Sequence, residues 1–327
     1  MPLDEEAAVD QLIANDPGNV AALIKKGDLR TSAGDEKIAN SFYRKALKVA
    51  SGGPVSSELK SELLRVQAAC RRSSGRFEEY LADSLRQAGF GDGQRPPRFQ
   101  ESIEILLGQR PAVSSLQNPR TYFYPGLPQR RYYERHEFPW AAELEQKADI
   151  IRDELLPSVK DERLFRPYLY SDPSRPPKHG MVDNPDWSSL TLWETGVPVP
   201  ETISQFPKTI EVVQKADLLR MPKRAPQIMF SKLAAGARIE PHVGLLNCRL
   251  VCHLPLIVPD GCMFRVGGED RQWREGQLLV FDDSIVHEAS NNSHQDRIVL
   301  IFEIWRPELD ADERAAVTAL FHAVDTY

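Results

Sequence analysis

The amino-acid sequence predicts an α+β protein in which an α-helical repeat region precedes a double-stranded β-helix, or jelly roll. From about residue 4 to 88 the chain is rich in Ala, Leu, Glu and Lys, a composition typical of helices. From about residue 227 to 305, short β-rich runs alternate with clusters of Gly, Pro and Asp, as in strands joined by tight turns. We therefore expect a helical region at 1–90, a linker with a connecting helix at 91–118, and the jelly roll at 119–327.

The helical region carries turn signals at "DPGN", "SAGD" and "ASGGP", which predict paired helices. Counted from Val20, the small residues Gly27 and Ala39 lie where two helices would approach closely, and Tyr43 would fill the space between pairs. This spacing resembles one tetratricopeptide unit, although an ordinary helical bundle would also accommodate it. Because one unit cannot bury its own face, we expect stacked helices in the flanking stretches "EEAAVDQLIA", "SELKSELLRVQAACRRS" and "RFEEYLADSLRQAG".

The Pro- and Arg-rich stretch "GFGDGQRPPRFQ" separates this region from the rest of the chain. We expect helices in "ESIEILLGQR" and from about Trp140 to Leu156. Expected strands are "QIMFSKL", "CRLVCHLPLIV", "MFRVG", "QLLVFDD" and "RIVLIFEIW".

Composition excludes several classes of partner. The formal charge is -6 over 327 residues, which disfavours binding to nucleic acid or to an anionic membrane. The amino terminus "MPLDEEAAVDQLIAND" is acidic, and apolar runs such as "IVLIFEIW" are far too short to span a bilayer. We therefore expect a cytoplasmic protein.

The four cysteines are Cys70, Cys248, Cys252 and Cys262. In a strand, the "CRLVC" spacing puts two sulfurs on one face. Reduced core cysteines are the expected state, with a disulfide or a metal site as the alternative.

Two histidines mark a candidate metal site. His242 lies in "EPHVGLLNCRLVCHLP" just before an expected strand, and His287 lies in "FDDSIVHEA" at the far end of a strand pair. The two would meet at one mouth of a jelly roll. Iron oxygenases of this architecture use two histidines and one carboxylate, but Gly244 supplies no carboxylate two residues after His242. Two structural histidines are the alternative.

A third feature favours the metal site. Arg297 lies ten residues after His287 at the start of the next strand, where a guanidinium would reach into the barrel and hold a carboxylate in a bidentate pair. The alternative, a surface ion pair, agrees poorly with the apolar "IVLIFEIW" that follows.

Asp282 and Asp283 stand close to His287 in the sequence. In an extended "FDDS" one side chain points inward and the next outward, so one at most faces the metal. We expect it to orient His287 or a metal-bound water by a hydrogen bond rather than to bind the metal directly.

Several motifs together resemble the aspartyl/asparaginyl β-hydroxylase family of Fe(II)- and 2-oxoglutarate-dependent oxygenases. They are "HVGLLNCRLVCHLPL", "FRVGGEDRQWREGQLLVFDDSIVHE" and "RIVLIFEIWRPELDADER". The likeness extends from about "PGLPQRRYY" to the last of these and includes "DWSSLTLW" at residues 186–193. The ordered set of these motifs is specific, and helical repeats joined to such a domain are also similar to family members.

The resemblance implies a role for each candidate residue. Members of the family hold iron with two histidines and have glycine where other oxygenases place the carboxylate, so Gly244 fits the pattern. His242 and His287 would be the iron ligands, and water or substrate would take the open position. Arg297 would bind the distal carboxylate of 2-oxoglutarate, with Ser231 as a hydrogen-bond partner.

Two further residues carry cosubstrate roles by the same resemblance. His253 would lie near the other carboxylate of 2-oxoglutarate, and Trp187 would wall the pocket; a core histidine and ordinary core packing are the alternatives. Arg249 is a candidate clamp for an acidic substrate side chain. Val251 stands where family members carry a second arginine, and this departure weakens the case for an aspartyl substrate.

The expected activity is O₂-dependent hydroxylation of an unactivated carbon, the β-carbon of an Asp- or Asn-like residue in a protein, peptide or amino-acid-derived substrate. The helical region would recruit that substrate. Alternatives are a small-molecule hydroxylase, a halogenase using the open iron position, and a catalytically silent scaffold protein. A branch of the family that acts on lipids usually carries membrane-anchoring segments.

Overall fold

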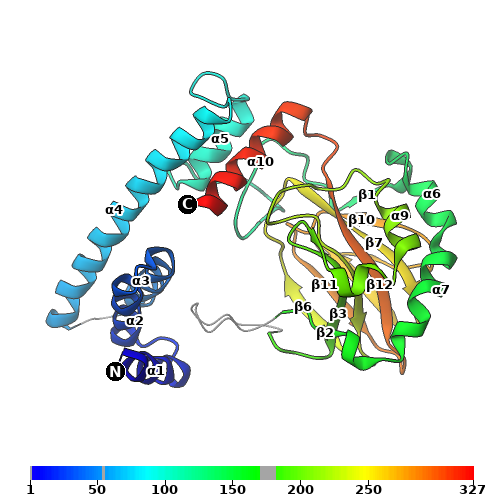
Figure 1. Ribbon diagram of the computed structural model, residues 1–327, viewed down its shortest axis with the longest axis horizontal. Coiled ribbons are helices and arrows are strands. Elements are labelled where there is room, and N and C mark those ends of the chain that lie inside the picture. Colours follow the sequence, from blue (N-terminus) through cyan, green and yellow to red (C-terminus); the bar gives the residue numbers. More distant parts are fainter. Residues whose placement is uncertain (1, 54–55, 170–181) are drawn as a thin grey trace. The chain divides into compact units, whose positions relative to one another are not determined.

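The computed structural model (Figure 1) describes residues 2–53, 56–169 and 182–327. The chain divides into two compact units. Of the described residues, the first contains 2–53, 56–82 and 182, and the second contains 83–169 and 183–327.

The first unit is helical. Its elements are α1 (Pro2–Asn15), α2 (Val20–Ser32), α3 (Glu36–Ala50) and most of α4 (Ser57–Gln87). Side chains cap two of the helices: Asn19 accepts a hydrogen bond from the N–H of Ala22, and Asp35 accepts one from the N–H of Ile38. Such caps satisfy backbone donors that have no partner within the helix.

The expectation of two separate helices in the last part of this unit is wrong, because α4 is continuous through the "SSGR" sequence. Gly75 lies within this helix at an exposed position, and its φ is not positive. A helical glycine costs only about 1 kcal/mol relative to alanine, and the favourable residues on both sides outweigh that cost.

A close approach joins α2 to α3. A Cβ added at Gly27 would lie 2.3 Å from Cε1 of Tyr43, so the tyrosine ring rests directly on the glycine backbone. The Tyr43 hydroxyl donates to Asp28 at 2.6 Å. This packing agrees with the spacing argument for Gly27 and Tyr43, while the tetratricopeptide assignment stays a prediction.

The second unit contains the remaining helices. They are α5 (Pro97–Leu106), α6 (Ala141–Gln146), α7 (Ala148–Val159), α8 (Pro200–Ile203), α9 (Pro207–Val213) and α10 (Ala311–Thr326), with the 3₁₀ turns η1 (Arg135–Glu137) and η2 (Glu162–Leu164). The helix expected in "ESIEILLGQR" starts four residues earlier, because Pro97 occupies the first helical position, where a missing N–H costs nothing. The helix expected from Trp140 to Leu156 is divided in two at Lys147.

Two antiparallel sheets build the double-stranded β-helix. The larger has the order β1-β10-β7-β12-β5-β3-β2, with β4 also paired to β3, and the smaller has the order β6-β11-β8-β9. The strands of the larger sheet are β1 (Tyr132–Tyr133), β2 (Arg166–Pro167), β3 (Trp187–Glu194), β4 (Val197–Pro198), β5 (Ile228–Leu233), β7 (Arg249–Ile257), β10 (Leu279–Phe281) and β12 (Arg297–Trp305). Those of the smaller sheet are β6 (Arg238–His242), β8 (Cys262–Val266), β9 (Glu269–Arg271) and β11 (His287–Asn291). The five strands expected from the sequence are confirmed as β5, β7, β8, β10 and β12.

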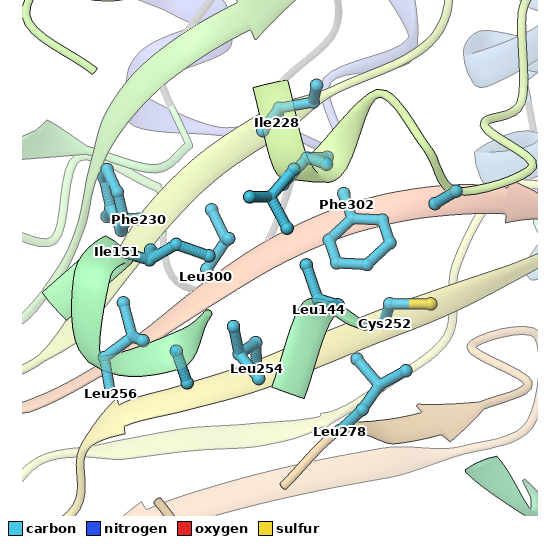
Figure 2. Close-up of a cluster of buried hydrophobic side chains, with 14 of the residues drawn as sticks. Leu144, Ile151, Ile228, Phe230, Cys252, Leu254, Leu256, Leu278, Leu300 and Phe302 are labelled. Carbon is cyan, nitrogen blue, oxygen red and sulfur yellow. The ribbon is translucent and has the colours of Figure 1, made fainter. Parts of the chain in front are cut away.

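The outer face of the larger sheet packs against α6, α7 and α9 (Figure 1). Figure 2 shows this core, in which alternate residues of β7 and β12 meet side chains from α6 and α7. They include Leu254, Leu256, Leu300, Phe302 and Cys252. Because successive strand residues point to opposite faces, the residues between them face the barrel interior.

The four cysteines are free thiols, and three of them are buried. Cys262 differs from the expectation of a core residue because it is only partly buried at the start of β8.

Among the described residues, no helix is both long enough and apolar enough to cross a lipid bilayer.

The contact between Gly27 and Tyr43 generates a stability prediction. Gly27→Ala is expected to lower the free energy of unfolding of the helical unit by about 1–3 kcal/mol, because the new methyl group overlaps the tyrosine ring. Chemical denaturation followed by circular dichroism measures this change.

Gly75→Ala is the matched control. A Cβ at Gly75 meets nothing within 4 Å, so this substitution is expected to stabilise α4 by about 0.5–1 kcal/mol. Equal effects of the two substitutions would show that the close approach at Gly27 is not what matters.

Candidate functional site

Two imidazole rings lie side by side on neighbouring strands of the smaller sheet. His242 ends β6 and does not precede a strand as expected, and His287 begins β11. The two are direct register partners, and their ring centroids lie 4.1 Å apart. The antiparallel pairing of β6 with β11 therefore brings together residues forty-five positions apart in the sequence.

Backbone carbonyls fix the orientation of both rings. Nδ1 of His242 lies 2.8 Å from the carbonyl oxygen of Glu240, and Nδ1 of His287 lies 2.9 Å from that of Ile285. A carbonyl only accepts hydrogen bonds, so each Nδ1 carries the proton. Each Nε2 is then left with a lone pair for a metal ion, and this carbonyl contact is the usual support for a histidine ligand.

Burial favours the neutral form of both rings. Burial lowers the pKa of His287 to about 4, with a further lowering from His242, and burial also lowers the pKa of His242. Neutral imidazole is the form that binds metals. Within residues 2–53, 56–169 and 182–327, no third His, Cys, Asp or Glu completes a metal-ligand group with this pair.

A carboxylate fills the space beside Gly244. A Cβ added there would lie 1.9 Å from Oδ2 of Asp283, and the Gly244 N–H donates to the Asp283 carbonyl at 2.6 Å. Any side chain at position 244 would therefore collide with Asp283. The carboxylate near the two histidines comes from the turn that precedes β11 and not from the strand that carries His242.

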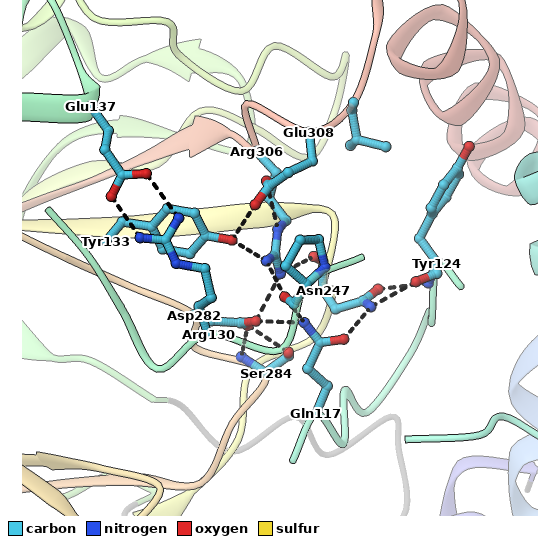
Figure 3. A network of polar contacts seen from close by, with 12 residues as sticks. Gln117, Tyr124, Arg130, Tyr133, Glu137, Asn247, Asp282, Ser284, Arg306 and Glu308 are labelled. Atoms are coloured by element: carbon cyan, nitrogen blue, oxygen red, sulfur yellow. Dashed lines mark hydrogen bonds and ion pairs between the residues drawn. The ribbon is translucent and has the colours of Figure 1, made fainter. Parts of the chain in front are cut away.

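Asp282 lies in a buried polar network, shown in Figure 3. Its Oδ2 accepts hydrogen bonds from Arg306 at 2.7 Å and Gln117 at 2.6 Å, and its Oδ1 accepts one from the Ser284 hydroxyl at 2.5 Å. The side chains of Arg306 and Asp282 are both 0% exposed. The role expected for Asp282 beside His287 or a metal-bound water therefore has no contact to support it.

The network ties distant segments to the turn before His287. Arg306 also donates to the carbonyl oxygens of Asn247 and Pro128, and Asn247 binds both Gln117 and Tyr124 (Figure 3). Sequence reasoning did not assign roles to Arg306, Gln117 or Asn247. The available signal was a charged residue directly after a buried strand, in "IVLIFEIWRPEL".

Arg297 is a buried cation without a carboxylate partner among the described residues. It is 1% exposed, its guanidinium lies 4.7 Å from the centre of the Trp273 ring, and its Nε has no hydrogen-bond partner. In the part of the chain that the structure describes, no carboxylate pairs with it or acts on its pKa. Burial lowers its pKa to about 10. Since an unpaired charge is strongly disfavoured inside a protein, this site is suited to an anionic ligand.

Side chains from β3, β5 and β7 lie on the same barrel interior as Arg297 and the histidines. His253 accepts a hydrogen bond from Nε1 of Trp273 at 3.3 Å, and burial holds its pKa well below the usual value. Trp187 donates to the Ser231 hydroxyl at 3.3 Å, and its ring lies 5.7 Å from that of His242. The structure thus places His253, Trp187 and Ser231 on the barrel interior, and Trp187 beside one of the two histidines.

Arg249 has a different environment from Arg297. One terminal nitrogen donates to Asp283 at 2.6 Å and the other donates to Glu303, and both acceptors are buried. Burial raises the pKa of Glu303, and Arg249 opposes that shift. Glu303 was not singled out from the sequence, although its charge interrupts the apolar run "IVLIFEIW".

The fold and these contacts define a double-stranded β-helix protein whose barrel holds a two-histidine centre. Residues 145–307 match the family model Aspartyl/Asparaginyl beta-hydroxylase. Through this domain, the chain belongs to the aspartyl/asparaginyl β-hydroxylase family.

Similar proteins cover this chain to different extents. The aspartyl/asparaginyl beta-hydroxylase of Mus musculus is 30% identical over 251 residues, which are 75% of this chain and 32% of that protein. Aspartate beta-hydroxylase domain-containing protein 2 of Homo sapiens is 32% identical over 221 residues, 66% of this chain and 57% of that protein. This chain thus spans about a third of the length of the first relative and just over half of the second.

A partial likeness to a solved structure, KdgF from Halomonas sp., has a TM-score of 0.25 at 13% identity and covers 40% of this chain and 90% of that chain. This likeness is too limited to bear on function.

The depressed pKa of His287 predicts a pH dependence of stability in metal-free protein. Unfolded, the imidazole takes up a proton near pH 6.5, whereas folded it does so near pH 4, so the unfolded state binds more protons between these values. The free energy of unfolding is expected to fall by up to about 3 kcal/mol as the pH drops from 7 to 4. Urea denaturation at a series of pH values, with a chelator present, measures this change.

His287→Asn provides the comparison, because it keeps a polar side chain and removes the titrating group. This variant is expected to lose part of the slope between pH 6.5 and 4. An unchanged slope would assign the effect to other groups.

Proposed function

We propose that this chain is an Fe(II)- and 2-oxoglutarate-dependent oxygenase that hydroxylates an unactivated carbon, the β-carbon of an Asp- or Asn-like residue in a protein or peptide. The observation that carries the proposal is the buried, unpaired guanidinium of Arg297 in the barrel that also holds the His242–His287 pair. A cosubstrate with two carboxylates and a metal-binding keto group fits such a combination.

The donor set fits ferrous iron. Two neutral imidazoles offer Nε2 lone pairs, and imidazole is a suitable ligand for iron in sites that keep positions open for cosubstrate and oxygen. Iron bound there would supply the reaction of O₂ with 2-oxoglutarate, which gives succinate and carbon dioxide; one oxygen atom of O₂ would enter succinate and the other the substrate C–H bond.

The protein's own groups position and shield the cosubstrate. Arg297 pairs with its distal carboxylate, and Ser231 donates a hydrogen bond at the same end. His253 and Trp187 close the sides of the pocket, since both are buried and held by hydrogen bonds to neighbouring side chains. An anion inside such a dry pocket is bound more strongly than one at the surface.

In this proposal Asp283 acts next to the open position beside Gly244. Its Oδ1 has no hydrogen-bond partner in the described part of the chain, so it is available to accept a hydrogen bond from water held there. The same negative charge repels chloride, which disfavours halogenation at this site relative to hydroxylation. We further propose that the helical unit recruits the protein or peptide substrate.

The metal ligands are tested by removing each imidazole in turn. His242→Ala and His287→Ala are expected to abolish iron-dependent formation of succinate from 2-oxoglutarate, because either change leaves one protein ligand. His294→Ala is the control, since His294 is exposed between β11 and β12. Circular dichroism confirms the fold of each variant. Full turnover in either ligand variant would disprove the metal assignment.

The cosubstrate site is tested at Arg297. Arg297→Ala is expected to weaken 2-oxoglutarate binding by about 2–4 kcal/mol, because a buried charge-assisted pair is lost. Steady-state kinetics with varied 2-oxoglutarate measures the rise in KM.

Arg265→Ala is the matched control, because Arg265 pairs with Asp270 at the surface and leaves the interior untouched. Arg297→Lys retains the charge and is expected to recover part of the affinity. Normal cosubstrate affinity in Arg297→Ala would remove Arg297 from the pocket.

A further inference from the structure

Two arginines face the same barrel interior, but only one of them is available to an anion. Arg297 and Glu303 lie on one face of β12, six residues and about 20 Å apart along the strand. Arg297 has no carboxylate within ion-pair distance in the described regions, whereas Arg249 pairs with Glu303 and Asp283. The barrel interior therefore contains one arginine suited to an anion and another that is already paired with two carboxylates.

The charges of Arg249 and its two carboxylate partners show that Arg249 has no positive charge left for an anionic ligand. With both carboxylates ionised, Arg249, Asp283 and Glu303 together carry a charge of about -1; with one carboxylate protonated they carry none. Neither state leaves an excess positive charge. All three side chains are nearly inaccessible to water, at 13%, 6% and 8% exposed, so solvent screens the group weakly.

The neighbouring residue adds no compensating cation. Val251 is the register partner of both Glu303 on β12 and Phe281 on β10, and alternation along β7 puts it on the same face as Arg249. An aliphatic side chain thus stands next to the Glu303 carboxylate, at a distance that a longer cationic side chain would span.

This group adjoins the centre where the acceptor must enter. Asp283 takes the space beside Gly244, and the charges of Asp283 and Arg249 both act on His287. An incoming carboxylate would meet Asp283 and Glu303 with repulsion and would have to compete for Arg249. An amide N–H₂ would instead donate to the unpartnered Oδ1 of Asp283.

We infer that the acceptor side chain entering this end of the barrel carries no negative charge, so this chain oxidises an asparagine-type amide in preference to an aspartate carboxylate. The inference rests on the proposed oxygenase function and narrows its acceptor. Arg249 is accordingly a residue that holds Asp283 and Glu303 in place, rather than a clamp for an acidic substrate.

The test uses two peptide libraries that are identical except for a fixed central Asn or Asp. The full chain is incubated with ferrous iron, 2-oxoglutarate and ¹⁸O₂, and mass spectrometry counts peptides that gain one labelled oxygen atom. The wild-type chain is expected to label the Asn library at least about tenfold more than the Asp library, a difference of about 1.4 kcal/mol.

Variants that change the charge at Val251 and Glu303 test whether these residues determine the preference for Asn over Asp. Val251→Arg is expected to shift the ratio at least tenfold toward Asp, with Val251→Met as a control of similar bulk and no charge. Because an arginine at this buried position can disturb folding, Glu303→Gln is the second variant; it removes one negative charge and is expected to shift the ratio in the same direction.

Succinate formed without any peptide is also measured. It distinguishes failure of the acceptor inference from failure of the oxygenase proposal. Equal or greater labelling of the Asp library, or charge variants that leave the ratio unchanged, overturns the inference about the acceptor. Peptide-free turnover with no labelling of either library also overturns it, while the oxygenase proposal stands. Absence of turnover with or without peptide overturns the oxygenase proposal itself, and the acceptor inference with it.

Discussion

The ion pair between Arg306 and Asp282 is the constraint on which the site depends. Both side chains are excluded from water, and their remaining polar atoms are bound by Gln117, Ser284 and backbone carbonyls. A buried pair of this kind contributes less to stability than to the choice of one backbone arrangement, because breaking it would leave an isolated charge in the interior. It fixes a turn whose next residues are Asp283 and, shortly after, His287.

The two arginines that face the barrel interior, Arg249 and Arg297, differ in their partners. Arg249 pairs with two carboxylates, whereas Nε of Arg297 has no hydrogen-bond partner in the described part of the chain. An interior cation without a partner lowers stability, so its presence in an otherwise well-packed barrel indicates a role in binding. Family membership and the facing imidazoles agree with that reading, which is why the cosubstrate proposal rests on Arg297.

Local patterns in the sequence predicted much of the fold. The strands β7 and β12 combine long apolar runs with flanking turn residues, and both were expected within two residues of their observed limits. The continuity of α4 was missed because two separate helices were expected on either side of residues 74–75, although a glycine ends a helix only where the chain needs its special conformations. The helix expected from Trp140 is divided at Lys147, and the helix expected in "ESIEILLGQR" begins earlier, at Pro97, because proline is tolerated at the first helical position.

The site was predictable in part. His242 and His287 could be selected as candidates from their positions relative to the expected strands, and Arg297 because a guanidinium stands at the start of a long apolar run. The pairings of Arg306 with Asp282 and of Arg249 with Glu303 could not, since they depend on which strands become neighbours. The position of Asp283 beside Gly244 likewise depends on a turn geometry that no spacing in the sequence specifies.

That last contact also restricts how this centre can change over evolutionary time. A side chain at position 244 and the carboxyl group of Asp283 cannot both be present, because a Cβ at position 244 would lie 1.9 Å from Oδ2 of Asp283. A mutation that introduced aspartate at 244 would not convert the centre into one with three protein ligands unless residue 283 were shortened in the same lineage. Under the proposed metal assignment, a third protein ligand at position 244 therefore requires a second substitution at residue 283.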